Sequence, residues 1–246
     1  MRLFAAVLTL LLLPAALAAQ KGKFPPDTLI NTKVFPHSTP PQQVIGAMRN
    51  FTSDLGVRCQ FCHVGEEGKP LDQFDFASDE KRTKVVARQM MLMVREINRR
   101  VDTLPRNGGA ALQVTCGTCH RGVSRPAPLF AVLTEIGTVS GADSAVRAYK
   151  ALRNRYYGRA AYDFGEVSLN TAAFRLGQAG KYDEAFALLT LNEEQFPMSS
   201  GLAVFRGNIL LMKGDTSAAE AAFREAIKRD STNNEARGRL RAIGRP

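Results

Sequence analysis

Two short stretches repeat one spacing of cysteine and histidine, and together they use every cysteine of the chain. The first reads CQFCH at residues 59–63 and the second reads CGTCH at residues 116–120. The four thiols are Cys59, Cys62, Cys116 and Cys119, and the histidines that follow them are His63 and His120. Any interpretation must explain the histidine as well as the cysteine pair.

Paired cysteines have three common explanations that do not involve a histidine. An oxidising compartment favours disulfide bonds, a redox pair uses the C-x-x-C spacing, and four thiolates form a zinc site. None of these requires a histidine after the second cysteine in both stretches. Covalent haem attachment does, because each thiol adds to a haem vinyl group and the adjacent histidine becomes the proximal iron ligand. The pattern predicts two covalently bound haem c groups, with His63 and His120 as proximal ligands.

Candidates for the two distal iron positions are few. The third histidine of the chain is His37, so at least one distal ligand is of another type, and methionine is the usual alternative. Met48 lies on an amphipathic stretch between Pro41 and Gly56, which suit the start and the end of a helix. A methionine in such a position can also be ordinary core filling.

A second amphipathic helix is expected over residues 78–104, with Ser78 or Asp79 as its N-cap. Met90 and Met93 share the apolar side of this helix, and either could reach the second iron. The rest of that side is expected to be core.

Three stretches resemble the cytochrome c subunit of photosynthetic reaction centres: MRNFTSDLGVRCQFCH, ARQMMLMVREIN and VTCGTCHRGVSRP. The resemblance covers about residues 44–130 and is to the second, two-haem half of that four-haem subunit. It implies a helix and a turn with C-x-x-C-H at each haem, and it places Met48 where the family has a distal methionine.

The resemblance leaves the distal ligand of the second haem open, because the family takes that histidine from the half that is not matched. Met90 is the first candidate and Met93 the second. His37 is the third, although its proline-rich loop suits a solvated histidine.

The ends of the chain suggest export and a separate repeat domain. Residues 1–18 are typical of a secretory signal peptide, so the mature chain is expected to be periplasmic and to have no membrane span. Residues 19–135 are the expected di-haem domain, and residues 136–246 the expected helical domain. In the helical domain, a 34-residue period relates Gly180 to Gly214, and the two segments that repeat with this period resemble tetratricopeptide repeats.

The expected fold class is therefore mainly α, with helix–turn–C-x-x-C-H units followed by helical repeats. Such repeats present a groove for a protein or peptide ligand, although two of them can also simply dimerise or extend the fold. The formal net charge of +10 is spread over both halves, which argues against a nucleic-acid partner. A modest positive surface suits steering of an acidic redox partner.

Three classes of function remain open. An electron carrier, not an enzyme, is expected if both irons are closed by protein ligands; its partners would be redox proteins, with a membrane-bound electron-transfer complex as one candidate. A haem enzyme of the peroxidase type, or a haem-based sensor, requires one open iron site.

Overall fold

Helices make up most of the computed structural model, which describes residues 23–105 and 108–245. Along these residues lie ten α-helices and two short 3-10 turns, together with an isolated β-bridge between Val64 and Asp75. The prediction of a mainly α fold is confirmed. The leader predicted at residues 1–18 lies outside the described residues. Within them, no helix has the length and apolar character that crossing a membrane requires.

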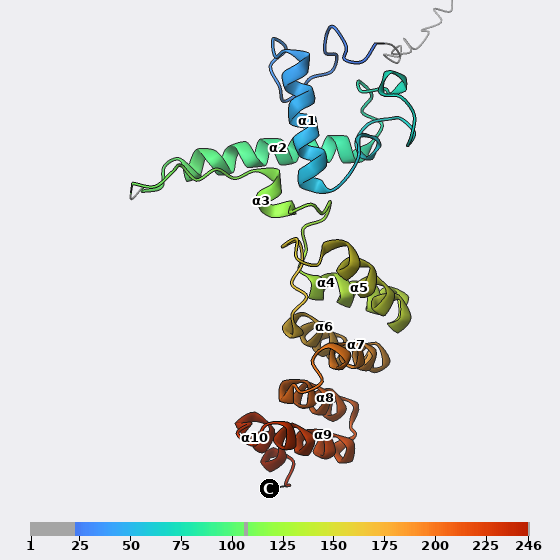
Figure 1. The fold of residues 1–246 in the computed structure, drawn as a ribbon, viewed down its shortest axis with the longest axis vertical. Coiled ribbons are helices and arrows are strands. Elements are labelled where there is room, and N and C mark those ends of the chain that lie inside the picture. The colour runs from blue at the N-terminus through green and yellow to red at the C-terminus, as the bar shows by residue number, and fades with distance from the viewer. Residues whose placement is uncertain (1–22, 106–107, 246) are drawn as a thin grey trace, which may run out of the picture. The chain divides into compact units, whose positions relative to one another are not determined.

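Contacts between Cα atoms divide the chain into two units at Thr118 and Cys119 (Figure 1). We call them the N-terminal unit and the C-terminal unit. The division falls earlier than the predicted boundary after residue 135, because Leu129 and Leu133 are fully buried in the hydrophobic core of the C-terminal unit.

In its described residues the N-terminal unit has two long helices and two 3-10 turns, joined by loops: α1 (Pro41–Leu55), η1 (Cys59–Phe61), η2 (Leu71–Gln73) and α2 (Arg82–Val101). Helix α1 begins after Pro40 and ends at Gly56, whose φ of 64° is left-handed. Proline suits the first turn of a helix, and glycine adopts a left-handed φ without strain, so both ends match the sequence.

Helix α2 begins later than the sequence suggested. Ser78 or Asp79 was the expected N-cap, but the helix starts at Arg82. The expectation is wrong because residues 76–78 form a loop that turns its carbonyl groups toward the buried ammonium group of Lys84. The three N–O distances from Lys84 Nζ are 2.9, 3.0 and 2.7 Å.

The C-terminal unit contains seven helices after α3 (Cys116–His120): α4 (Leu129–Ser140), α5 (Ala142–Tyr156), α6 (Glu166–Gln178), α7 (Tyr182–Gln195), α8 (Ser200–Lys213), α9 (Thr216–Arg229) and α10 (Asn234–Ala242). Helices α6, α8 and α10 start at residues 166, 200 and 234, which is the 34-residue period of the sequence. Gly180 and Gly214 follow the first helix of each pair, with φ of 73° and 88°.

Small residues let the paired helices of the C-terminal unit approach closely. Ala185 and Ala219 are fully buried at equivalent positions of the period. A Cβ added to Gly207 would lie 2.4 Å from the ring of Phe223, so only glycine fits there. These features agree with the expected repeats, and the assignment to tetratricopeptide repeats stays a prediction.

Candidate haem-attachment site

The first C-x-x-C-H motif closes into one tight turn, η1. The backbone N–H groups of Cys62 and His63 both donate to the carbonyl of Cys59, at 3.2 and 2.9 Å. Both cysteines are half-buried thiols. The turn therefore brings two thiols and an imidazole together within five residues, which is what covalent attachment of one haem requires.

Aromatic rings hold the imidazole of His63. The ring of Phe76 meets it edge-on, with 4.9 Å between centroids, and Phe76 stacks on Phe74 at 5.6 Å. Gly65 makes room for this stack, because a Cβ there would lie 2.4 Å from the Phe74 ring. The Nδ1 atom of His63 is buried, and no described residue offers it a hydrogen bond.

The same surroundings keep His63 neutral. Burial lowers the pKa of its imidazole to about 4, and the nearby charge of Lys84 acts in the same direction. At physiological pH the ring is therefore unprotonated, which is the form that binds a metal ion.

The second motif forms the short helix α3 and ends in a left-handed turn. Arg121 and Gly122 have φ of 50° and 82°, and they return the chain so that the Val123 carbonyl lies 2.9 Å from Nδ1 of His120. A carbonyl only accepts, so Nδ1–H donates and Nε2 keeps its lone pair. This is the usual way in which a metal-binding histidine is oriented.

Helix α2 fastens both motifs through polar side chains. Near its start, the hydroxyl of Thr83 donates to the Phe61 carbonyl in the first motif. Near its end, the Asn98 amide makes two hydrogen bonds of 2.8 Å with the backbone of Val114, just before the second motif. The two attachment points are about 22 Å apart along the helix. One rigid element thus positions both motifs.

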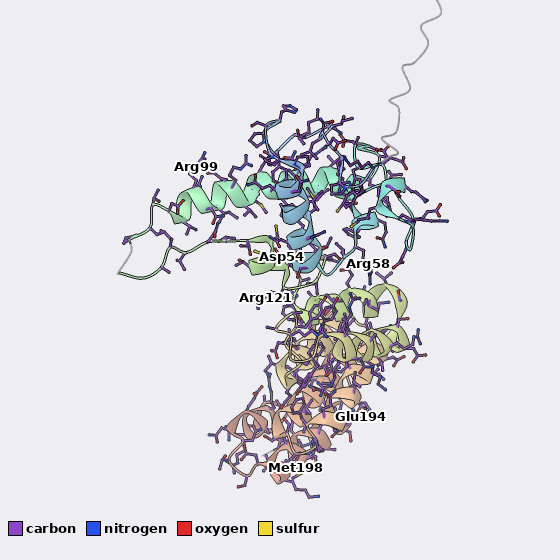
Figure 2. The ribbon with its side chains drawn as sticks, turned by 45° about the horizontal axis from the view of Figure 1, so that its top comes forward. Asp54, Arg58, Arg99, Arg121, Glu194 and Met198 are labelled. Atoms are coloured by element: carbon purple, nitrogen blue, oxygen red, sulfur yellow. The ribbon has the colours of Figure 1, made fainter. Side chains whose placement is uncertain are left out.

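Helix α1 also approaches the second motif. A Cβ added to Gly117, one of the two spacer residues of that motif, would lie 2.8 Å from the carboxylate of Asp54 at the end of α1 (labelled in Figure 2). The spacer glycine therefore permits a close approach that a larger residue would obstruct.

An ionic network fixes the loop before α2. The carboxylate of Asp79 lies 2.9 Å from Arg88 and 3.1 Å from Lys84, and it accepts a hydrogen bond of 2.9 Å from Asn31. The Arg88 guanidinium holds the pKa of Asp79 well below its usual range. The network connects the segment before α1 to α2.

The candidate distal ligands differ in their surroundings. Met48 is half-buried on α1, whereas Met90 and Met93 on α2 are 42% and 49% exposed. His37 is exposed, and its Nδ1 lies 3.0 Å from the hydroxyl of Thr32. All four remain predictions.

The described residues fit haem in two respects. The donors have the right chemistry, with thiols in each motif, a neutral His63 and a His120 whose Nδ1–H is engaged. In addition, α2 exposes apolar side chains of the kind that pack on a macrocycle: Val85, Val86, Met90, Leu92 and Met93.

Comparison with known proteins decides the family. The sequence model described as photosynthetic reaction centre cytochrome C subunit matches residues 14–162. The chain belongs to this family. The resemblance seen in its motifs is thereby confirmed, and with the two C-x-x-C-H motifs it makes the chain a c-type cytochrome.

Among the curated relatives, two match about a third of the chain. Cytochrome c-554 of Chloroflexus aurantiacus is 38% identical over 80 residues, which are 32% of this chain and 17% of the relative. The photosynthetic reaction center cytochrome c subunit of Roseobacter denitrificans is 37% identical over 78 residues, 32% of this chain and 19% of the relative. The chain thus covers less than a fifth of each relative. No solved structure matches it.

Sequence reasoning missed the residues that position the motifs. Thr83, Asn98 and Gly117 lie outside the apolar pattern, and nothing in their spacing signals which backbone they approach. It also missed a local run of basic residues between Asp143 and Asp163, because charge was counted over whole halves of the chain.

Proposed function

We propose that the chain is an exported di-haem electron carrier. Each motif binds one haem c through its two cysteines, with His63 and His120 as proximal ligands. Met48 is the distal ligand of the first haem and Met90 that of the second, with Met93 and then His37 as alternatives.

The observation that carries the proposal is that one helix, α2, fastens both motifs. An electron carrier needs its redox centres held at a fixed spacing. Transfer of an electron changes the charge of a centre and requires no large movement of the protein. The hydrogen bonds of Thr83 and Asn98 to the two motif segments supply this rigidity. Bound haem would supply reversible one-electron chemistry at iron.

The chain's own residues would set how readily each iron gives up its electron. A hydrogen bond from Nδ1 to a carbonyl makes a histidine a more basic ligand. Nδ1 of His120 has this bond, whereas Nδ1 of His63 has no partner at hydrogen-bond distance among the described residues, and the His63 imidazole makes only a looser interaction with the backbone of Phe76. We therefore expect the second haem to have the lower reduction potential, as far as the proximal ligands decide it.

The location and partners follow from the same proposal. The apolar segment at residues 1–18 supports export to the periplasm. The family name supports redox proteins as partners, including a membrane-bound photosynthetic complex. The helical repeats would dock a protein or peptide. The alternative is that they join two copies of this chain. Gel filtration of the purified chain would distinguish a monomer from a dimer.

The first test is a haem count combined with carbon monoxide binding. We expect two haems per chain by pyridine haemochrome assay and no carbon monoxide difference spectrum for the dithionite-reduced protein. Stoichiometric binding to one haem would instead favour the enzyme or sensor, since both need an open iron.

Matched methionine variants then test the ligands. Met48→Ala and Met90→Ala should each open one haem to carbon monoxide, whereas Met91→Ala, beside Met90 on the same helix, should open none. If Met93→Ala opens the second haem and Met90→Ala does not, Met93 is the ligand.

A further inference from the structure

A basic segment without acidic residues follows the second motif in the C-terminal unit. Between Asp143 and Asp163 the sequence contains five basic residues and no carboxylate: Arg147, Lys150, Arg153, Arg155 and Arg159. The segment covers most of α5 and the loop after it. Arg147, Lys150, Arg155 and Arg159 are exposed to solvent.

Tyrosine rings pack within and beside the basic segment; we call the segment and these rings the basic surface. The Arg153 guanidinium lies 4.2 Å from the ring centroid of Tyr157, which is 65% exposed. Tyr156 packs edge-on against Tyr162, with 5.5 Å between centroids. Tyrosine and arginine dominate the residues that contribute most to protein–protein binding, and rings held in advance lose little freedom on binding.

The surface begins next to the second haem-attachment motif. Arg121 directly follows His120, and its guanidinium donates to the carbonyl of Ala160 at 3.3 Å. Ala160 lies in the loop between Arg159 and Tyr162. The basic segment is therefore connected to the residue next to the proposed proximal ligand by a hydrogen bond within the same unit.

Two charges of this segment, those of Lys150 and Arg159, differ from other charges of the unit in having no carboxylate partner among the described residues. Arg206 and Arg229 share the carboxylate of Glu193 at 3.1 and 2.7 Å. By contrast, no carboxylate of the described residues lies within ion-pair distance of Lys150 or Arg159. Their field is available to a partner.

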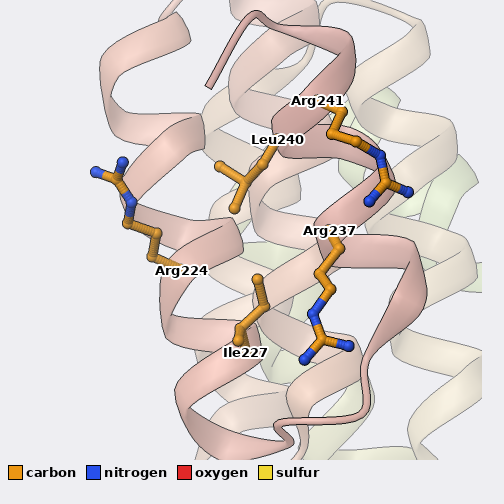
Figure 3. A pocket seen from close by; sticks show the side chains of 5 residues that line it. All are labelled: Arg224, Ile227, Arg237, Leu240 and Arg241. Carbon is orange, nitrogen blue, oxygen red and sulfur yellow. The ribbon is translucent and has the colours of Figure 1, made fainter. Parts of the chain in front are cut away.

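A second arginine cluster serves as a comparison. Arg224, Arg237 and Arg241 surround Ile227 and Leu240 in a groove of about 360 Å³ between α9 and α10 (Figure 3). It lies at the other end of the unit's sequence, and no described contact connects it to the haem motif.

We propose that the surface formed by the basic segment and its tyrosines docks an acidic electron-transfer protein, which exchanges electrons at the second haem. This rests on the proposed carrier function and adds the place and the charge of the partner. In this exchange one electron would pass between the redox centre of the partner and the haem that Cys116, Cys119 and His120 would hold, so that one is oxidised as the other is reduced.

The test compares two reductants that share a flavin. Reduced flavodoxin is a small acidic protein that holds flavin mononucleotide, and reduced riboflavin has the same isoalloxazine ring without the protein. Stopped-flow mixing with the oxidised holoprotein gives a second-order rate constant for each, measured over a range of ionic strength. The variant is Arg147→Gln/Lys150→Gln/Arg159→Gln, which removes three exposed charges and leaves the tyrosine contacts in place.

At low salt we expect the variant to react with flavodoxin about tenfold more slowly than the parent, and with a flatter salt dependence. The rate with riboflavin should not change. The control is Arg224→Gln/Arg237→Gln/Arg241→Gln, which removes the same charge at the groove of Figure 3 and should slow flavodoxin by less than about threefold.

Other outcomes overturn the proposal. Equal slowing by the variant and the control would mean that net charge alone acts. Unchanged flavodoxin rates, together with loss of binding to phosphatidylglycerol vesicles in the variant, would assign the surface to a membrane. If riboflavin reduces no haem in the parent, the carrier function itself fails, and the docking question does not arise.

Discussion

Different interactions stabilise the N-terminal unit and the C-terminal unit. In the C-terminal unit, apolar side chains from successive helices form two buried clusters, and residues such as Leu133 and Phe223 are fully buried. Among the described residues of the N-terminal unit, only Val44 and Phe74 are buried hydrophobic residues. The helices of the first unit thus lack the core that stabilises those of the second.

Polar side chains replace that core in part. At the N-cap of α2 and along the helix, backbone carbonyl groups of neighbouring segments accept hydrogen bonds from the side chains of Lys81, Thr83, Arg88 and Asn98. Such hydrogen bonds contribute about 1 kcal/mol each for the neutral side chains of Thr83 and Asn98 and about 1.5–3 kcal/mol each for the charged Lys81 and Arg88, because they replace bonds to water. The comparison teaches that the N-terminal unit needs a further apolar component, and the exposed apolar side of α2 is where haem would supply it.

The largest expected effect comes from preventing attachment. With all four cysteines replaced by serine, we expect residues 23–118 to become sensitive to limited proteolysis, while the C-terminal unit stays resistant. Mass spectrometry of the resistant fragment identifies which unit survives. Equal protection of the N-terminal unit with and without haem would break the comparison.

Next is a cavity in the C-terminal core. Phe223→Ala should lower the free energy of unfolding of that unit by about 3–5 kcal/mol, because it removes a fully buried ring. Chemical denaturation followed by circular dichroism measures the change. Val139→Ala, at a position that is 80% exposed, is the control and should have almost no effect. The haem spectrum should be unchanged in both variants.

A polar substitution tests the other unit. Lys84→Met should destabilise the N-terminal unit by about 2–4 kcal/mol, because it leaves three carbonyl groups and the Asp79 carboxylate without their buried cation. Lys69→Met, at an exposed position, should be neutral. The unfolding midpoint read from haem absorbance measures the effect; a neutral Lys84→Met would show that the loop before α2 is held by other contacts.

The smallest expected effect is on how the stability of the N-terminal unit depends on pH. The pKa of Asp79 is lowered in the folded chain, so the unfolded chain takes up its proton first as pH falls. The stabilisation is present above the unfolded pKa, near 4, and is lost progressively below it. Since the carboxylate is partly exposed, we expect about 1 kcal/mol or less. Asp79→Asn should flatten the acid limb of stability against pH, whereas a limb that stays unchanged would contradict this.

The sequence was most informative where a pattern repeats or a residue type is restrictive. Proline and glycine at its ends bounded α1, and the 34-residue period located the helices from α6 to α10. The sequence was least informative for α2. Asp79 is a good N-cap by type, but its carboxylate pairs with Lys84 and Arg88, and that pairing depends on a loop fold that no local pattern encodes. The distal ligands stay predictions because their positions also depend on how segments distant in the sequence pack together.

The sparse apolar core of the N-terminal unit has a consequence for the order of biosynthesis. Synthesis delivers residues 23–118 before the helices of the C-terminal unit, yet it is the later segment that contains the two buried apolar clusters. The earlier segment would stay open, with its thiols accessible, until the attachment machinery has acted on it. The part of the chain that is made first is therefore the part that matures last.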